Sequence, residues 1–81
     1  MRVLPASAQL IAARALLQLE QRELAQLSGL HVNILVRMEA DGWEMVPGTT
    51  TTINRVLDVL EKRGVEFIEN GVRLTRRPRR R

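Results

Sequence analysis

Four side chains suited to binding fall together on one side of a short predicted helix, about Val32 to Glu39. Leu35 and Met38 are three residues apart and define the inward edge of that helix. The other side then carries an amide, a guanidinium and two branched apolar groups, from Asn33, Arg37, Val32 and Val36. An amide or a guanidinium can make two parallel hydrogen bonds to one planar partner. The pattern therefore predicts a helix that lies against another molecule.

The residue types needed for catalysis are scarce. The chain has one histidine and no cysteine, and neither paired carboxylates in an evident pocket nor a glycine-rich phosphate loop can be found. We therefore expect no enzyme, no metal site and no cofactor. No small-molecule ligand is indicated, because 81 residues make a single small domain.

The positive charge is concentrated at the C-terminus. Residues 1–75 hold 8 basic and 9 acidic side chains, so the net charge of +4 comes from five arginines at the end of the chain. Like charges repel, and we expect residues 76–81 to form a disordered basic tail. This tail is either a basic arm that tracks phosphates or enters a minor groove, or a solubilising end, and we favour the arm. Its arginines are Arg76, Arg77, Arg79, Arg80 and Arg81.

No segment approaches the ~20 apolar residues that span a bilayer. The apolar run over residues 10–19 is interrupted by Arg14 and lacks a small-residue cleavage site, which argues against a signal peptide. The absence of cysteine fits a reducing compartment. We expect a cytoplasmic protein that binds no membrane.

The surrounding pattern predicts a mainly α fold. Helical spacing of apolar residues indicates a first helix over about 8–17 and a last one over about 51–63, capped by a threonine from residues 50–52. Between them, Leu24 and Leu27 mark a helix that opens at Gln21. Gly29 then breaks the pattern before the helix that starts at Val32, because glycine accepts a positive φ.

The order ELAQLSG followed by LHVNILVRME resembles the helix-turn-helix of the Cro and phage-repressor-like (xenobiotic-response-element type, Cro/C1-type) family of bacterial transcriptional regulators. The resemblance covers about Ala8 to Leu60. It implies a domain of four (or five short) helices in residues 1–64. It also implies a regulator, such as a repressor, that binds double-stranded DNA at an inverted repeat as a homodimer, with the third helix in the major groove. Such a protein lies in the bacterial cytoplasm, nucleoid-associated when DNA-bound.

By this resemblance Val32, Asn33 and Arg37 fall on base-reading positions, with Val36 adjacent. Asparagine can bond adenine, arginine can bond guanine, and valine can touch a thymine methyl. For Arg37 a surface ion pair or a phosphate contact is an equal alternative. The position of Ile34 often carries a small polar residue in the family, and here the isoleucine is expected to pack inward.

The resemblance also assigns supporting residues. Gln21 matches a position that meets phosphate at a helix N-terminus. His31 is either a second phosphate contact or only a helix cap. An arginine at position 14 pairs in the family with the glutamate that closes the third helix, here Glu39. We favour this structural ion pair over a solvated Arg14, because both residues match together.

Trp43 lies in the loop after the third helix. It could stack on a nucleic acid, but a lone loop tryptophan more often covers a small core, and we favour that role.

Residues 65–75 change to an alternating pattern and predict a β-hairpin. The pair Asn70-Gly71 suits a type I′ turn, which places Glu69 opposite Val72. The same register puts residue 67 opposite 74 and residue 65 opposite 76. The hairpin must either pack on its own helices or mediate dimerisation, and we favour dimerisation in place of a fifth helix. The residues assigned to that role are Val65, Phe67, Ile68, Val72 and Leu74.

A rival interpretation is a helix-turn-helix used as a protein-interaction module or as an antitoxin-like partner. The near-neutral charge of residues 1–75 and the apolar side chains of Val32, Ile34 and Val36 favour it.

Overall fold

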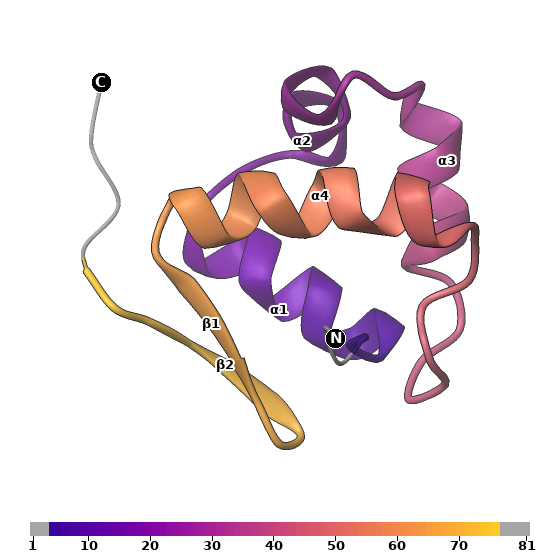
Figure 1. Ribbon diagram of the computed structural model, residues 1–81. Helices are drawn as coiled ribbons and strands as arrows, with labels where there is room; N and C mark the ends of the chain where they lie inside the picture. Colours follow the sequence, from indigo (N-terminus) through magenta and orange to yellow (C-terminus); the bar gives the residue numbers. More distant parts are fainter. Residues whose placement is uncertain (1–3, 77–81) are drawn as a thin grey trace.

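The described part of the chain forms four helices followed by one antiparallel hairpin (Figure 1). The structure is a computed structural model, and it describes residues 4–76. No helix in this range is long and apolar enough to cross a membrane. The boundaries of α1, α3 and α4 lie within one residue of those predicted. The elements are α1 (Ser7–Leu16), α2 (Gln21–Ser28), α3 (Val32–Met38), α4 (Thr50–Lys62), β1 (Val65–Ile68) and β2 (Gly71–Leu74).

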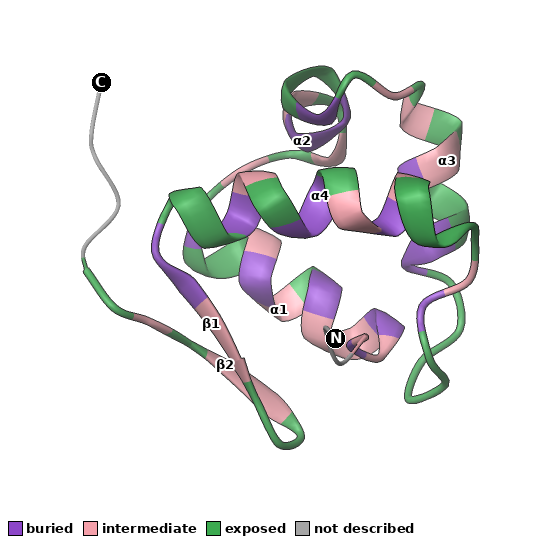
Figure 2. Cartoon of the chain, in the orientation of Figure 1, coloured by how far each residue is buried: buried purple, intermediate pink, exposed green. Residues whose placement is uncertain are grey.

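All four helices contribute to one aliphatic core, and their buried sides face each other in Figure 2. The stripe of α4 predicted from its spacing is buried throughout. Burial of such side chains contributes about 1.5–3 kcal/mol each and is the main source of stability in a domain of this size. The core residues are Leu10, Ala13, Leu17, Leu24, Ala25, Leu35, Met38, Val46, Ile53, Val56, Leu57, Leu60 and Val65.

The N-cap of α4 is one residue earlier than predicted. Thr49, rather than a threonine of 50–52, has the extended backbone of a cap, and its hydroxyl accepts a hydrogen bond from the Thr52 N–H at 3.2 Å. This bond satisfies one of the free amides in the first turn.

The hairpin is present, but its predicted register is wrong by two residues. Phe67 pairs with Val72 and Val65 with Leu74, so the two turn residues are Glu69 and Asn70. Asn70 alone has a positive φ, of 59°, whereas a type I′ turn at Asn70-Gly71 requires two. A shift of two positions keeps every side chain on its face of the sheet, since the strand period is two.

The inner face of the hairpin packs on the protein's own helices. Val65 is buried, and Phe67, Val72 and Leu74 are partly buried against the core. The amide of Gln9 in α1 ties down the turn, because its Nε2 donates to the carbonyls of Ile68 and Gly71 at 2.7 and 3.0 Å.

The outer face of the hairpin is polar except for Ile68, which is 44% exposed. On that face Arg73 Nε donates to Glu66 Oε1 at 2.7 Å. This hydrogen bond and the charge of Glu66 raise the pKa of Arg73. The face is therefore solvated and locally neutral.

Arg76 does not belong to a free tail. Thr75 donates through its N–H to the Gly64 carbonyl at 2.7 Å, and the Arg76 guanidinium donates to the Lys62 carbonyl. Arg76 therefore lies at the C-terminus of α4, where a cation is favoured by the helix dipole. Of the arginines in the predicted tail over 76–81, Arg76 thus contacts the end of α4, and the other four lie outside the described residues.

Candidate nucleic-acid interface

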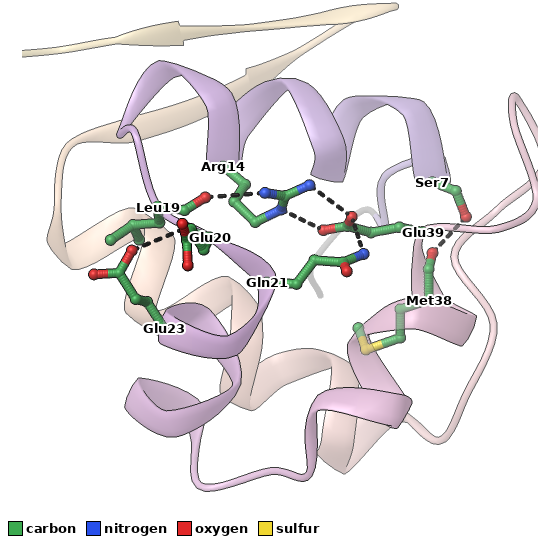
Figure 3. A network of polar contacts seen from close by, with 8 residues as sticks. All are labelled: Ser7, Arg14, Leu19, Glu20, Gln21, Glu23, Met38 and Glu39. Carbon is green, nitrogen blue, oxygen red and sulfur yellow. Dashed lines mark hydrogen bonds and ion pairs between the residues drawn. The ribbon is translucent and has the colours of Figure 1, made fainter.

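The C-terminal end of α3 is fastened to α1 and α2 by a network of polar contacts (Figure 3). The Ser7 hydroxyl, buried at the start of α1, donates to the Met38 carbonyl at 2.5 Å. One residue further, the side chain of Glu39 is only 4% exposed. A buried carboxylate requires hydrogen-bond donors, and three reach it.

Two of these donors come from Arg14, as predicted. Its Nε and one terminal nitrogen donate to the two oxygens of Glu39 at 2.9 and 3.0 Å, in the paired geometry that arginine makes with carboxylates. The other terminal nitrogen donates to the Leu19 carbonyl at 3.0 Å. The ion pair therefore fixes the crossing of α3 with α1 and also holds the link that leads to α2.

The third donor is the Gln21 side chain, whose Nε2 lies 2.8 Å from Glu39 Oε1. We expected this side chain to meet phosphate, whereas in the structure it binds the ion pair instead. Its backbone N–H lies in the first turn of α2, where the amides have no partner within the helix. The sequence carried no signal for the contact with Glu39, which joins residues 18 positions apart.

The turn between α2 and α3 is closed by glycine. Gly29 has a φ of 71°, and the Leu30 N–H donates to the Ala25 carbonyl at 2.8 Å, the 6→1 bond of a Schellman motif. Leu30 then packs partly buried against the core. These bonds fix where α3 begins.

His31 caps α3. Its Nδ1 accepts a hydrogen bond from the Asn33 N–H at 3.1 Å. The structure thus shows His31 as a helix cap, the second of its two predicted roles. Its imidazole stays exposed beside the first turn of α3.

The outer side of α3 is exposed to solvent. Asn33, Val36 and Arg37 are exposed, and Val36 leaves 47% of its surface open. Within residues 4–76, neither the Asn33 nor the Arg37 side chain has a hydrogen bond or ion pair. Val32 and Ile34 are only partly exposed and pack against the core, as expected for Ile34. Of the four residues predicted on the outer side of α3, three are exposed, and Val32 lies at the edge of that side, partly packed on the core.

Sequence reasoning missed Arg55. This exposed residue of α4 reaches over the α2–α3 turn, and its NH1 is 3.7 Å from the place where a Cβ on Gly29 would lie. The contact joins segments 26 residues apart in the sequence, and no local pattern signals it. A guanidinium is therefore added to the same side of the molecule as the start of α3.

The described residues show no group of three or more histidine, aspartate or glutamate side chains that could hold a metal ion. The chain matches no model of a known protein family and no curated protein. Its candidate function therefore depends on the geometry of this interface.

Proposed function

We propose that the protein is a sequence-specific DNA-binding transcriptional regulator that inserts α3 into the major groove. One observation supports this most strongly. α3 is fixed at its C-terminal end by Ser7 and Arg14, while the exposed side chains of Asn33 and Arg37 have no partner within residues 4–76. A short rigid helix with free hydrogen-bonding groups on its outer side is what base reading requires.

The chemistry of the outer side fits base edges. Arg37 bonds guanine O6 and N7, Asn33 bonds adenine N6 and N7, and Val36 contacts a thymine methyl. Each paired hydrogen bond contributes about 1–3 kcal/mol of discrimination against a wrong base.

Phosphate contacts come from groups around the start of α2 and α3. These are the backbone N–H of Gln21, the imidazole of His31 and the guanidinium of Arg55. Phosphate contacts position a protein on the duplex without reading sequence. Because residues 1–75 carry a net charge of −1, few cations are available, and binding outside the tail is expected to depend only weakly on salt.

One copy makes too few base contacts for useful specificity, so the binding unit is a homodimer on an inverted repeat. Its two α3 helices lie about 34 Å apart, on successive turns of the major groove.

The test is a selection of duplexes from a random library, followed by affinity measurements on the selected duplex at physiological salt. We expect Arg37→Ala and Asn33→Ala to weaken binding by about 5- to 150-fold and to relax specificity at one base pair of each half-site. The matched control is Arg73→Ala, which removes the same charge from the outer face of the hairpin and leaves affinity unchanged.

Two results would count against the proposal. One is a library from which the folded protein enriches no sequence. The other is an equal loss of affinity in Arg37→Ala and Arg73→Ala, which indicates a non-specific effect of charge.

A protein-interaction module is the second candidate, because Leu27 in α2 and Val36 in α3 leave 45% and 47% of their surfaces exposed. It predicts that the selection fails, and that Val36→Asp and Leu27→Asp, rather than Asn33→Ala, prevent binding to a protein partner.

A further inference from the structure

The loop between α3 and α4 carries the two most exposed large apolar side chains among residues 4–76. Trp43 is 68% exposed and Met45 is 64% exposed, whereas the other exposed large apolar residues leave no more than 47% of their surface open. The prediction that Trp43 covers the core is wrong, because Val46 from the same loop, 1% exposed, occupies that place. Tryptophan and methionine are among the residue types enriched where proteins bind each other.

The backbone of this loop is held in place by hydrogen bonds. The Val46 N–H donates to the Pro5 carbonyl at 2.9 Å, and the Ser7 N–H donates to the Glu44 carbonyl at 3.0 Å. Within the loop the Glu44 N–H donates to the Asp41 carbonyl at 2.9 Å, which closes a turn. The apolar pair is therefore presented on a fixed backbone, and little order has to be gained when a partner binds.

Two carboxylates lie beside the apolar pair in the loop. Asp41 and Glu44 are exposed, and within residues 4–76 neither side chain has a hydrogen bond or an ion pair. Residues 38–54 include no lysine, arginine or histidine, and residues 4–8, to which the loop bonds, carry no charged side chain. In the described part of the chain, the loop therefore has two negative charges that no cation neutralises.

These charges favour one kind of partner. The phosphates of a nucleic acid or of an anionic membrane would meet both carboxylates and be repelled. A second copy docked across a two-fold axis would bring the carboxylates of the two copies together, which is repulsive for the same reason. Lysine and arginine side chains are attracted instead, and a large apolar side chain between them buries surface on the tryptophan and the methionine.

We propose that the α3–α4 loop is a docking site for a protein segment in which lysine or arginine residues flank a large apolar side chain. Trp43 and Met45 bind the apolar side chain, while Asp41 and Glu44 pair with the cations. The loop leaves the C-terminal end of α3, whereas the turn from α2 enters at the N-terminal end (Figure 1). The site is therefore separate from the groups at the start of α3 and does not depend on DNA binding.

The size of the surface indicates a transient complex with a short segment. Trp43 and Met45 together offer on the order of 300 Å², against about 800 Å² per partner in a stable interface. The two carboxylates are exposed, so their attraction for cations is screened by salt, and the affinity should fall as the salt concentration rises.

The accessibility of Trp43 provides the first test, because the chain has no other tryptophan and no tyrosine. In the free full chain we expect acrylamide to quench its emission nearly as fast as that of N-acetyl-tryptophanamide. Strong protection from acrylamide means that another part of the chain, or a second copy, already covers the site. That result overturns the proposal.

A selection from a random-peptide phage library provides the second test. The folded full chain is the target, and the double variant Trp43→Ala with Met45→Ala is used for counter-selection. Both side chains are exposed, so the double variant should keep the fold, which circular dichroism verifies. We expect the enriched peptides to combine a large apolar residue with flanking lysine or arginine residues. No enrichment over the double variant, or peptides without cations, overturns the proposal.

A labelled synthetic copy of an enriched peptide then separates the two contributions by fluorescence anisotropy. Trp43→Ala should weaken binding at least about 30-fold, as for a tryptophan at the centre of an interface. Asp41→Asn combined with Glu44→Gln should weaken it by about 2- to 25-fold and remove most of its dependence on salt. The matched control Glu69→Gln removes an exposed carboxylate from the hairpin turn and should leave the affinity unchanged.

Two outcomes of the peptide measurements contradict the proposal. One is an unchanged affinity in Trp43→Ala or in the double carboxylate variant, and the other is an equal loss in Glu69→Gln. None of these measurements uses DNA, so they decide the docking site even if the regulator proposal fails. A selected duplex that protects Trp43 from acrylamide when the peptide does not would assign the loop to nucleic acid and overturn the proposal.

Discussion

Replacing Arg14 with methionine tests whether the ion pair positions α3. The substitution keeps the length of the aliphatic stem but removes two of the three donors that reach Glu39. The Glu39 side chain is 4% exposed, so its charge remains buried with Gln21 as the sole remaining donor. Removing one partner of a buried pair costs about 3–5 kcal/mol. Arg14 itself is 20% exposed, so water partly replaces it, and we expect a loss of about 3 kcal/mol.

This loss is large for such a small domain. An 81-residue protein has a free energy of unfolding of roughly 4–12 kcal/mol. With an m-value of about 1 kcal/mol/M, the urea midpoint of Arg14→Met should fall by about 3 M. The transition should be followed by circular dichroism at the helical band, because Trp43 is already exposed in the folded state and its emission reports unfolding poorly.

The double variant Arg14→Met with Glu39→Met separates positioning from packing. Replacing both charges with apolar groups removes the unpaired carboxylate, and such replacements are often neutral or stabilising. We therefore expect the double variant to recover most of the stability lost in the single one. A loss below about 1 kcal/mol in Arg14→Met, or a double variant as unstable as the sum of the two single ones, would refute this reasoning.

Three further outcomes are expected. Gly29→Ala should cost about 1 kcal/mol, because Gly29 has a positive φ. Gly64→Ala should cost more, because Gly64 also has a positive φ and its added Cβ would lie only 3.0 Å from the Arg76 side chain. Equal urea midpoints of the two variants would contradict this. Gln9→Ala should speed amide hydrogen exchange in the hairpin and not in α4, since it removes both donors to the turn. Deleting residues 77–81 should reduce the slope of log affinity against log salt by up to about 4 if these arginines form a basic arm, and an unchanged slope indicates a solubilising end.

The helices could be predicted because their signals are local. Each apolar stripe repeats within a few turns, and a glycine at position 29 or 64 marks where a helix must end. The pairing of Arg14 with Glu39 was also predictable, but through the family resemblance and not through spacing, because the two residues are 25 positions apart.

The hairpin shows what alternation does and does not determine. It identifies correctly which side chains share the inner face, because any register of the same parity gives the same answer. It does not determine the register, which depends on the turn. Here the Gln9 amide binds the two carbonyls that flank Glu69 and Asn70, a contact made across about 60 residues. A turn preference read from Asn70-Gly71 alone does not include that contact.

The same reason explains the errors at Trp43 and Gln21. An apolar residue in a loop and a polar residue at a helix start have typical environments. The actual environment depends on which residues from elsewhere in the chain pack or bond there. Val46 fills the core position expected for Trp43, and Glu39 attracts the amide of Gln21. Long-range competition of this kind leaves no periodic pattern in the sequence.

The division of α3 into an anchored end and a free side separates stability from recognition. Met38 and Glu39 hold the helix through contacts that Asn33 and Arg37 do not share. Substitutions on the free side should therefore change which molecule is bound while the free energy of unfolding stays nearly constant. A substitution at the anchored end should change both binding and the free energy of unfolding, because it destabilises the fold and also alters the orientation of the exposed side of α3. Stability and affinity should be measured on the same Arg37→Ala and Arg14→Met proteins. The comparison distinguishes a helix that is positioned for binding from one that only packs on the rest of the protein.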